Sequence, residues 1–131
     1  VMTAIRIRRR DYEGYTGCYI KYGKRNAMEI ATLGCACLVK LSLDKKVVVD
    51  MRIAYGVAAP TPVRCPETEK AVSGKAVSKA LLLQTGKGVL NEVNPRTSWR
   101  ASKEFRLQLV EELAKRAMAQ AIRNGGGDVD A

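Results

Sequence analysis

The amino-terminal part of the chain alternates apolar and polar residues in the way that is typical of β-strands. In residues 1–9, Ile5 and Ile7 alternate with arginines, which predicts a short strand that leads into the domain. Residues 10–17 contain two glycines among charged and aromatic residues and are expected to form a loop. Residues 19–22 then have an extended pattern, so a second strand is expected there.

A long apolar segment, residues 28–43, comes next and is followed by a polar turn and a second apolar run. Its β-branched residues and the alternation in its second half favour strand over helix. Residues 44–46 are typical of a turn, so the segment and residues 47–57 are expected to pair as a β-hairpin. Pro60 and Pro62 end the returning strand because proline has no N–H to donate to a sheet.

The remaining sequence has helical signals. Pro66 fits the first position of a helix, and Glu67 and Glu69 suit its first turn, where carboxylates complement the helix dipole. A second helix is expected before the Asn-Pro pair at 94–95, and two glycines weaken or break it. These glycines are Gly86 and Gly88.

A third helix is predicted to start at a serine N-cap, Ser98 or Ser102, and to end at the glycines of 125–127. Its apolar positions recur at helical spacing and predict a face that packs in the core, with Phe105 among them. These positions are Phe105, Leu109, Leu113, Ala117 and Ala121, with Val110, Ala114, Met118 and Ile122 alongside. Residues 128–131 are expected to be a frayed tail.

Strands followed by helices predict the fold class. The pattern is that of an α+β domain, in which an antiparallel sheet of about three to four strands is followed by a three-helix cluster packed on it. At 131 residues the chain is expected to be a single domain, 1–131. A Rossmann fold would need alternating strands and helices with a glycine fingerprint, and the sequence has neither.

Composition limits the class of protein further. Hydrophobic residues make up 47% and charged residues 27%, as in ordinary soluble domains. The sequence has no apolar run long enough to span a bilayer and no signal peptide, so a cytoplasmic protein is expected. Because the chain begins in strand-like sequence, we expect it to be part of a longer protein.

The net charge of +10 allows two interpretations. It could attract nucleic acid or phosphate, or it could form a solvated face that meets an acidic neighbour in a parent protein. The positive charges are scattered along the chain, which favours the second interpretation.

The sequence offers no catalytic set and no metal site. It contains no histidine, and its four cysteines form no C-x-x-C motif. They are Cys18, Cys35, Cys37 and Cys65. We expect Cys35 and Cys37 to be small buried residues in a reducing cytoplasm. None of the four cysteines has an activating histidine, so we expect the domain not to be a self-sufficient enzyme.

The best candidate for a cofactor contact is Lys21, which lies between Tyr19 and Tyr22 and is followed by the basic pair at 24–25. Such a group could hold an anion or a flavin, since aromatic rings cover a flat ring and a cation stabilises negative charge on it. Alternatively it is a strand at the sheet edge with its lysines in water, which composition alone favours. The stretch 99–106 is better explained by a structural role than by cofactor binding, with its arginines paired to backbone or carboxylates inside the domain.

Three stretches in register resemble one protein family. They are Lys21-Tyr22-Gly23-Lys24-Arg25-Asn26-Ala27-Met28-Glu29-Ile30-Ala31, Gly56-Val57-Ala58-Ala59-Pro60-Thr61-Pro62-Val63-Arg64 and Trp99-Arg100-Ala101-Ser102-Lys103-Glu104-Phe105-Arg106. Together they resemble the C-terminal domain of molybdenum-hydroxylase flavoproteins. This is the FAD-binding subunit of xanthine dehydrogenases and the medium subunit of aerobic carbon monoxide dehydrogenases. Glu29 and Phe105 stand where the family often has Asp and Tyr.

The resemblance implies that FAD is bound mainly by glycine-rich loops in a preceding region, from which residues 1–9 would continue. It implies that Lys21 reaches the flavin and that Met2 makes an apolar contact with FAD. The implied partners are a molybdenum-binding large subunit, an iron–sulfur small subunit with 2Fe–2S clusters, and NAD as electron acceptor. The fragment would then belong to a multi-subunit oxidoreductase of purine metabolism and be inactive alone.

A second hypothesis comes from another class of function. A freestanding basic nucleic-acid-binding domain could stack bases on tyrosines next to the nearby cations. These tyrosines are Tyr12, Tyr15, Tyr19 and Tyr22.

Overall fold

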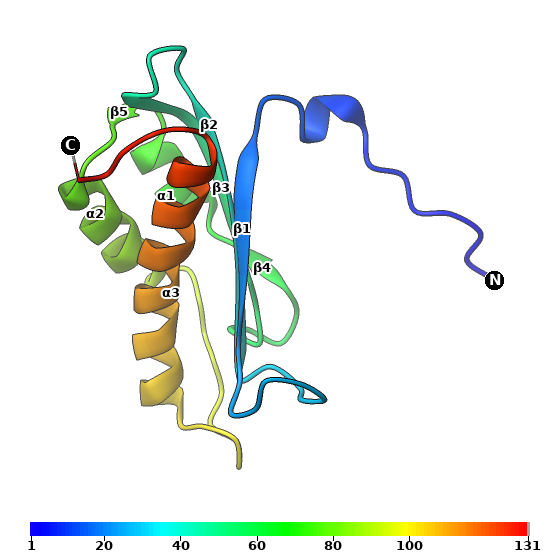
Figure 1. Cartoon of the computed structure of the whole chain (residues 1–131). Coiled ribbons are helices and arrows are strands. Elements are labelled where there is room, and N and C mark those ends of the chain that lie inside the picture. The colour runs from blue at the N-terminus through cyan, green and yellow to red at the C-terminus, as the bar shows by residue number, and fades with distance from the viewer. Residues whose placement is uncertain (131) are drawn as a thin grey trace.

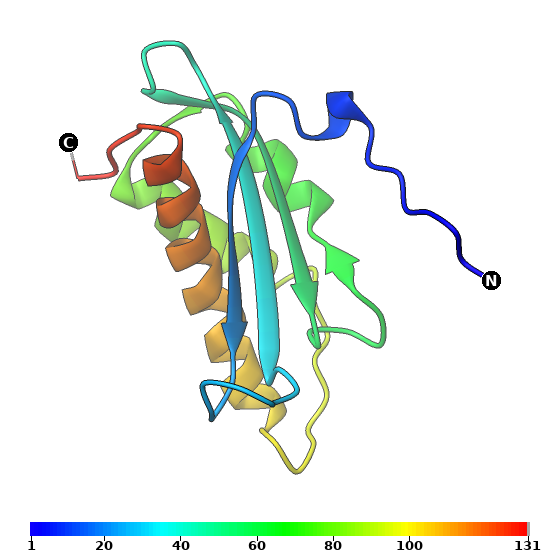
Figure 2. The same ribbon diagram turned by 45° about the vertical axis from the view of Figure 1, so that its right-hand side comes forward.

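The computed structural model describes residues 1–130 and contains an antiparallel sheet with helices packed on one face (Figures 1 and 2). The strand order is β1-β2-β3-β4, and β5 also pairs with β3. The strands are β1 (Thr16–Tyr22), β2 (Leu33–Leu41), β3 (Val47–Gly56), β4 (Val63–Arg64) and β5 (Lys75–Ala76). The helices are the 3₁₀ turn η1 (Arg9–Asp11), α1 (Pro66–Val72), α2 (Lys79–Val89) and α3 (Lys103–Asn124).

The predicted α+β class is confirmed, and the five-stranded sheet includes two short strands that the sequence did not predict. β4 and β5 have two residues each and pair with different parts of β3. The β2–β3 hairpin is confirmed as well. Its turn is closed by the N–H of Lys45 donating to the carbonyl of Ser42, and the hydroxyl of Ser42 accepts from the N–H of Val47.

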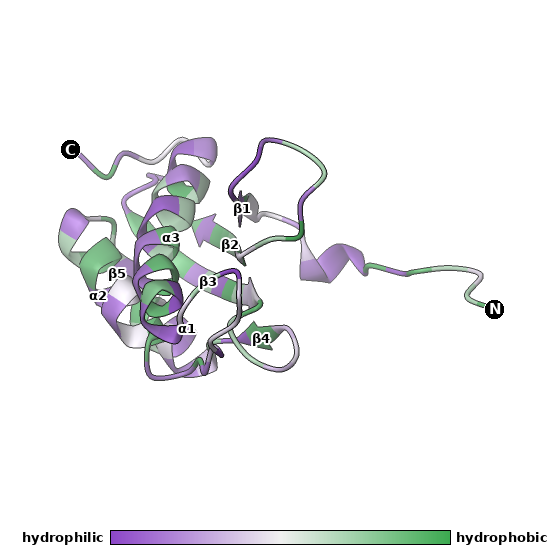
Figure 3. Cartoon of the chain, turned by 90° about the horizontal axis from the view of Figure 1, so that it is seen from below, coloured by the Kyte–Doolittle hydropathy of each residue, from purple (hydrophilic) through white to green (hydrophobic). Residues whose placement is uncertain are grey.

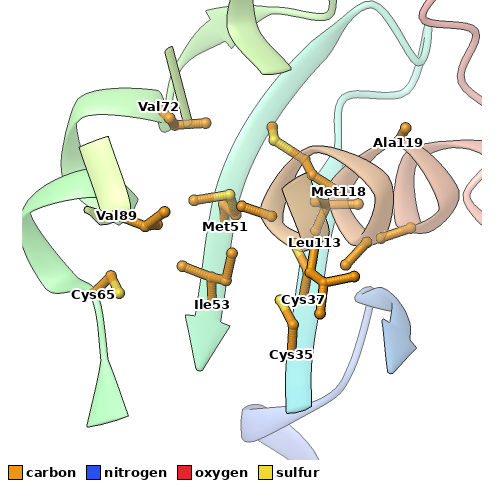
Figure 4. Packing of buried hydrophobic residues seen from close by; sticks show 14 of the residues in the cluster. Cys35, Cys37, Met51, Ile53, Cys65, Val72, Val89, Leu113, Met118 and Ala119 are labelled. Carbon is orange, nitrogen blue, oxygen red and sulfur yellow. The ribbon is translucent and has the colours of Figure 1, made fainter. Parts of the chain in front are cut away.

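The core lies between the sheet and the helices (Figure 4). Successive residues of a strand point to opposite faces, so alternate residues of β2 and β3 enter it. Cys35 and Cys37 of β2 are fully buried, and Met51 and Ile53 of β3 are almost so. They pack against α3, which contributes Met118 and other apolar residues.

Helix α2 continues through its two glycines instead of breaking there. A Cβ on Gly86 would lie 3.1 Å from the carbonyl oxygen of Glu111 in α3, and one on Gly88 would lie 2.8 Å from the hydroxyl of Thr68 in α1. These glycines therefore let the three helices approach closely. Ser78 caps α2 and Ser102 caps α3, each by accepting a backbone N–H of the first turn.

The expected strand at residues 1–9 is not formed. Residues 1–8 have no regular structure, all of them are exposed, and η1 follows them. The segment extends away from the sheet in both views (Figures 1 and 2). A strand needs a neighbour to hydrogen-bond with, and residues 1–130 provide none for this segment.

The expected frayed tail is corrected for residues 128–130, while Ala131 lies outside the described residues. Val129 is only 4% exposed and belongs to the core cluster. The carboxylate of Asp130 pairs with Lys79 at 3.1 Å and with Arg123 at 3.3 Å. Burial of Val129 offsets the entropy cost of ordering the tail.

Among the described residues, no helix is long and apolar enough to cross a membrane.

Candidate functional site

Lys21 and Tyr19 lie on the face of the sheet that the helices leave open. Their neighbours in β1, Cys18 and Ile20, pack against the core under α3. Because side chains alternate along a strand, Tyr19 and Lys21 point the other way. Tyr19 is 65% exposed. The predicted extended conformation of this stretch is confirmed.

The floor beside these two side chains is made of small residues. Lys21 lies opposite Gly34 in β2, which in turn lies opposite Gly56 in β3. In the next row on the same face, Tyr19 is followed by Ala36 and Ala54. A Cβ at Gly34 would come within 2.9 Å of the hydroxyl of Tyr19. The tyrosine thus lies low over Gly34, whereas the sheet surface at Gly56 is open, because a Cβ there would meet no atom within 4 Å. A flat group can therefore approach the backbone beside the tyrosine at Gly56.

The loop that follows β1 is held in shape by its own polar groups. The ammonium group of Lys21 donates to the carbonyl of Glu29. The backbone N–H of Arg25 donates to the carboxylate of Glu29 at 2.6 Å, and its guanidinium donates to the carbonyl of Met28 at 2.6 Å. Hydrogen bonds from the backbone at Arg25 and Lys24 hold the pKa of Glu29 below its usual value. The loop combines hydrophilic and hydrophobic residues (Figure 3).

Arg106 links separate chain segments at this end of the molecule from a buried position. Its side chain is almost fully buried, with 1% of its surface exposed. It donates to the carbonyl of Thr32 at 3.2 Å, to the carbonyl of Arg96, and to the hydroxyl of Ser98 at 2.9 Å. Desolvation, followed by the nearby cations Arg96 and Arg100, lowers its pKa.

The expected pairing of Arg106 with backbone is therefore confirmed, while the expected burial of its neighbour is wrong. Phe105 is 39% exposed and makes an edge contact with Tyr22, with 6.0 Å between the ring centroids. The guanidinium group takes the core position because it can bind carbonyl groups on two chain segments at once.

Met2, the second predicted cofactor contact, is not brought near Lys21. It is 79% exposed in the segment that precedes η1. That segment joins the sheet at the start of β1, whereas Lys21 is near the end of the strand (Figure 2). The proposed role of Met2 therefore depends on the resemblance alone.

A polar cluster on the open face was not predicted from the sequence. The hydroxyl of Tyr15 donates to Asp50 and accepts from Arg52 at 3.0 Å, and the guanidinium lies 4.6 Å from the centre of the tyrosine ring. Desolvation and the hydrogen bond to Asp50 raise the pKa of Tyr15. Arg52 also donates to the carbonyl of Asp11, so the cluster holds η1 against the sheet. Only the strand register brings these residues together, and no local motif signals it.

Cys35 and Cys37 behave as buried apolar residues, as expected. Cys35, Cys37 and Cys65 have no exposed surface, and Cys18 is half-buried opposite Cys37. Burial raises the pKa of Cys35 and of Cys65 to about 12, and it also raises that of Cys37. Within residues 1–130, no group of three or more His, Cys, Asp or Glu side chains could hold a metal ion.

We expect a small thiol reagent to label Cys18 alone in the folded protein at about pH 8. The other thiols are covered and remain protonated, so they should react only after unfolding in urea. Spectrophotometric thiol counting measures both steps, and Cys18→Ser is the control that should abolish the rapid step. Rapid labelling of Cys35 or Cys37 in the folded state would contradict the burial described here.

Comparison with known proteins shows the family of this chain. Residues 18–121 match the family described as the CO dehydrogenase flavoprotein C-terminal domain. The chain belongs to this family.

Curated relatives and solved structures place the flavoprotein C-terminal domain in larger chains. The putative xanthine dehydrogenase FAD-binding subunit XdhB of Escherichia coli is 41% identical over 83% of this chain. The glyceraldehyde dehydrogenase medium chain of Sulfolobus acidocaldarius is 30% identical over 82% of it. The chain spans 37% of the length of both relatives.

Solved structures with a similar fold are also longer than this chain. The carbon monoxide dehydrogenase of Hydrogenophaga pseudoflava matches 86% of this chain with a TM-score of 0.78 at 26% identity, and the match covers 38% of that chain. Quinoline 2-oxidoreductase of Pseudomonas putida has the same TM-score at 17% identity, which shows a shared fold. The family resemblance of the three sequence stretches is thus confirmed.

Proposed function

We propose that the chain is the C-terminal part of the FAD-binding subunit of a xanthine dehydrogenase-like molybdenum hydroxylase, and that its open sheet face covers FAD. One observation carries this proposal. Lys21 and Tyr19 stand on an uncovered face beside the small residues Gly34, Ala36 and Gly56. A cation next to an aromatic residue and a shallow floor fits the edge of a flat, electron-accepting ring.

Within this proposal, the residues of the chain position and stabilise the cofactor. FAD supplies the reversible acceptance of electrons when it is bound. The ammonium group of Lys21 has N–H groups left over from its bond to Glu29 and would stabilise negative charge on the reduced ring. Met2 would add an apolar contact. Most of the FAD-binding surface would come from another region of the subunit.

We further propose the assembly in which this domain works. A molybdenum-binding large subunit and an iron–sulfur small subunit would deliver electrons through 2Fe–2S clusters to FAD and then to NAD, in the cytoplasm. The name of the Escherichia coli relative, a xanthine dehydrogenase subunit, supports a purine substrate. The chain has no histidine, and we expect it to be inactive on its own.

Lys21→Ala in the full-length subunit is expected to lower the reduction potential of the flavin by about 30 mV or more, equivalent to roughly 1.4 kcal/mol for two electrons. The lost cation no longer stabilises the reduced ring. Spectroelectrochemical titration of the holoenzyme measures the shift, together with NAD reduction. Lys46→Ala, in the hairpin turn at the opposite end of the sheet, is the matched control. Unchanged potential and turnover in Lys21→Ala would remove the role proposed for Lys21.

The nucleic-acid hypothesis gains no support from the geometry. Tyr19 and Tyr22 point to opposite faces of β1, since they are an odd number of residues apart. Tyr15 is engaged with Asp50 and Arg52. The four tyrosines therefore do not form one stacking platform for bases.

A further inference from the structure

We propose that the end of the molecule formed by residues 23–31 and 94–102 docks onto an acidic surface of another polypeptide. Six residues make the contact and are called the basic end surface: Lys24, Arg25, Met28, Ile30, Trp99 and Arg100. Together with Glu29 and Thr32 they line a hollow of about 450 Å³. The inference rests on the proposed function, since it takes the partner to be another subunit of the same enzyme.

Large apolar side chains stand out from this surface. Met28 is 92% exposed, Trp99 82% and Ile30 66%, and they come from two loops that are far apart in the sequence. Scattered exposed apolar residues are normal, but here three of them surround one hollow. Tryptophan and methionine are enriched at the centres of protein interfaces, and tryptophan often dominates their binding energy.

The charge around these side chains has one sign. Lys24, Arg25 and Arg100 line the hollow, and the guanidinium of Arg100 lies 4.3 Å from the centre of the Trp99 ring. Beneath them, the buried cation of Arg106 is bound only to neutral oxygen atoms. Glu29 is the one carboxylate in the lining, and it is already occupied by the N–H of Arg25. A complementary partner must therefore present carboxylates.

Both loops are fixed before any partner arrives. Arg106 binds Thr32 on one side and Arg96 and Ser98 on the other. Met28 adopts a left-handed backbone conformation with φ of 51°, which is unfavourable for a residue with a side chain. Its carbonyl accepts from Arg25, which helps to hold this conformation. A strained residue that points a large apolar side chain into solvent is a feature of binding sites rather than of stability.

The shape favours a polypeptide over a nucleotide. Small-molecule sites enclose most of the ligand surface, and their lining side chains are mostly covered. Met28 and Trp99 instead project outward with most of their surface exposed. Side chains of this kind enter pockets on a partner, while the surrounding cations pair with carboxylates at the rim.

The experiment uses the assembled enzyme purified from its own cells. Trp99→Ala is expected to weaken the association of the full-length subunit with its partner subunits at least about 30-fold, as for a tryptophan at the centre of an interface. Lys24→Glu and Arg100→Glu should each weaken it and reduce its dependence on salt. Analytical size-exclusion chromatography across a NaCl series measures both effects. Lys46→Glu, which reverses an exposed charge at the other end of the sheet, is the control and should leave association unchanged.

A photo-crosslinking amino acid at position 99 identifies the occupant. A crosslink to an acidic stretch of another subunit supports the proposal. A crosslink within the same polypeptide, a crosslink to a second copy of it, or no crosslink overturns it. Loss of FAD from Trp99→Ala without loss of partner subunits also overturns it, in favour of a cofactor contact. The flavin content of the purified subunit separates the two proposals. A wild-type subunit without FAD contradicts the proposed function. Normal FAD content with unchanged association in Trp99→Ala contradicts only the docking surface.

Discussion

Replacing Arg106 by alanine is expected to lower the free energy of unfolding by about 3–5 kcal/mol. The side chain is buried and makes three hydrogen bonds, to the carbonyls of Thr32 and Arg96 and to the hydroxyl of Ser98. Each bond from a charged donor contributes about 1.5–3 kcal/mol, and their sum is reduced because they are not independent. Alanine also leaves buried carbonyl groups without a donor and opens a cavity.

Urea unfolding measures the loss, and two variants separate its causes. Arg106→Lys keeps the charge but not the planar fork, so it should lose about 2–3 kcal/mol. Arg116→Ala removes an arginine from an exposed ion pair with Glu112 on the same helix and should cost less than about 1 kcal/mol. Trp99 is the only tryptophan, so its fluorescence reports on the loop directly. If Arg106→Ala were as stable as Arg116→Ala, Arg106 would not be what links the segments at Thr32, Arg96 and Ser98.

The set of α3 residues that faces the core shows both the strength and the limit of sequence-based prediction. The helical spacing of its apolar residues identified the helix, because this periodicity is local. The buried positions run from Leu109 to Ile122, and one turn earlier the same stripe includes Arg106 rather than Phe105. An arginine is ordinarily assigned to the surface. Its partners are carbonyl groups on distant segments, which no local pattern reveals.

The shallow open face also has a signature in the sequence of β2. Within the apolar segment 28–43, Leu33, Cys35 and Cys37 are separated by the smaller residues Gly34 and Ala36. That alternation already distinguishes a packed face from a shallow one. The sequence predicts the extended segment that carries Lys21, but only the register with β2 and β3 shows that this lysine lies beside the small residues.

Glu69 gives the second large effect, and it makes contacts that the sequence does not predict. Glu67 and Glu69 lie in the first turn of α1, as expected. The carboxylate of Glu69 also accepts the N–H of Ile53 at 3.0 Å and binds Arg64 through both oxygens, at 3.0 and 2.6 Å. It is only 8% exposed, so it links α1 to β3 and β4 from a buried position.

Glu69→Ala is therefore expected to cost about 2–4 kcal/mol of unfolding free energy in urea, since it leaves the N–H of Ile53 without an acceptor. Glu69→Gln keeps an acceptor for that N–H and loses the ion pair with Arg64, which is 57% exposed at its side chain, so it should cost only about 0.5–1.5 kcal/mol. Glu67→Gln, at an exposed carboxylate two residues away, should change stability by less than about 0.5 kcal/mol. Equal losses for Glu69→Gln and Glu69→Ala would show that the charge pair with Arg64, and not the bond to Ile53, joins the helix to the sheet.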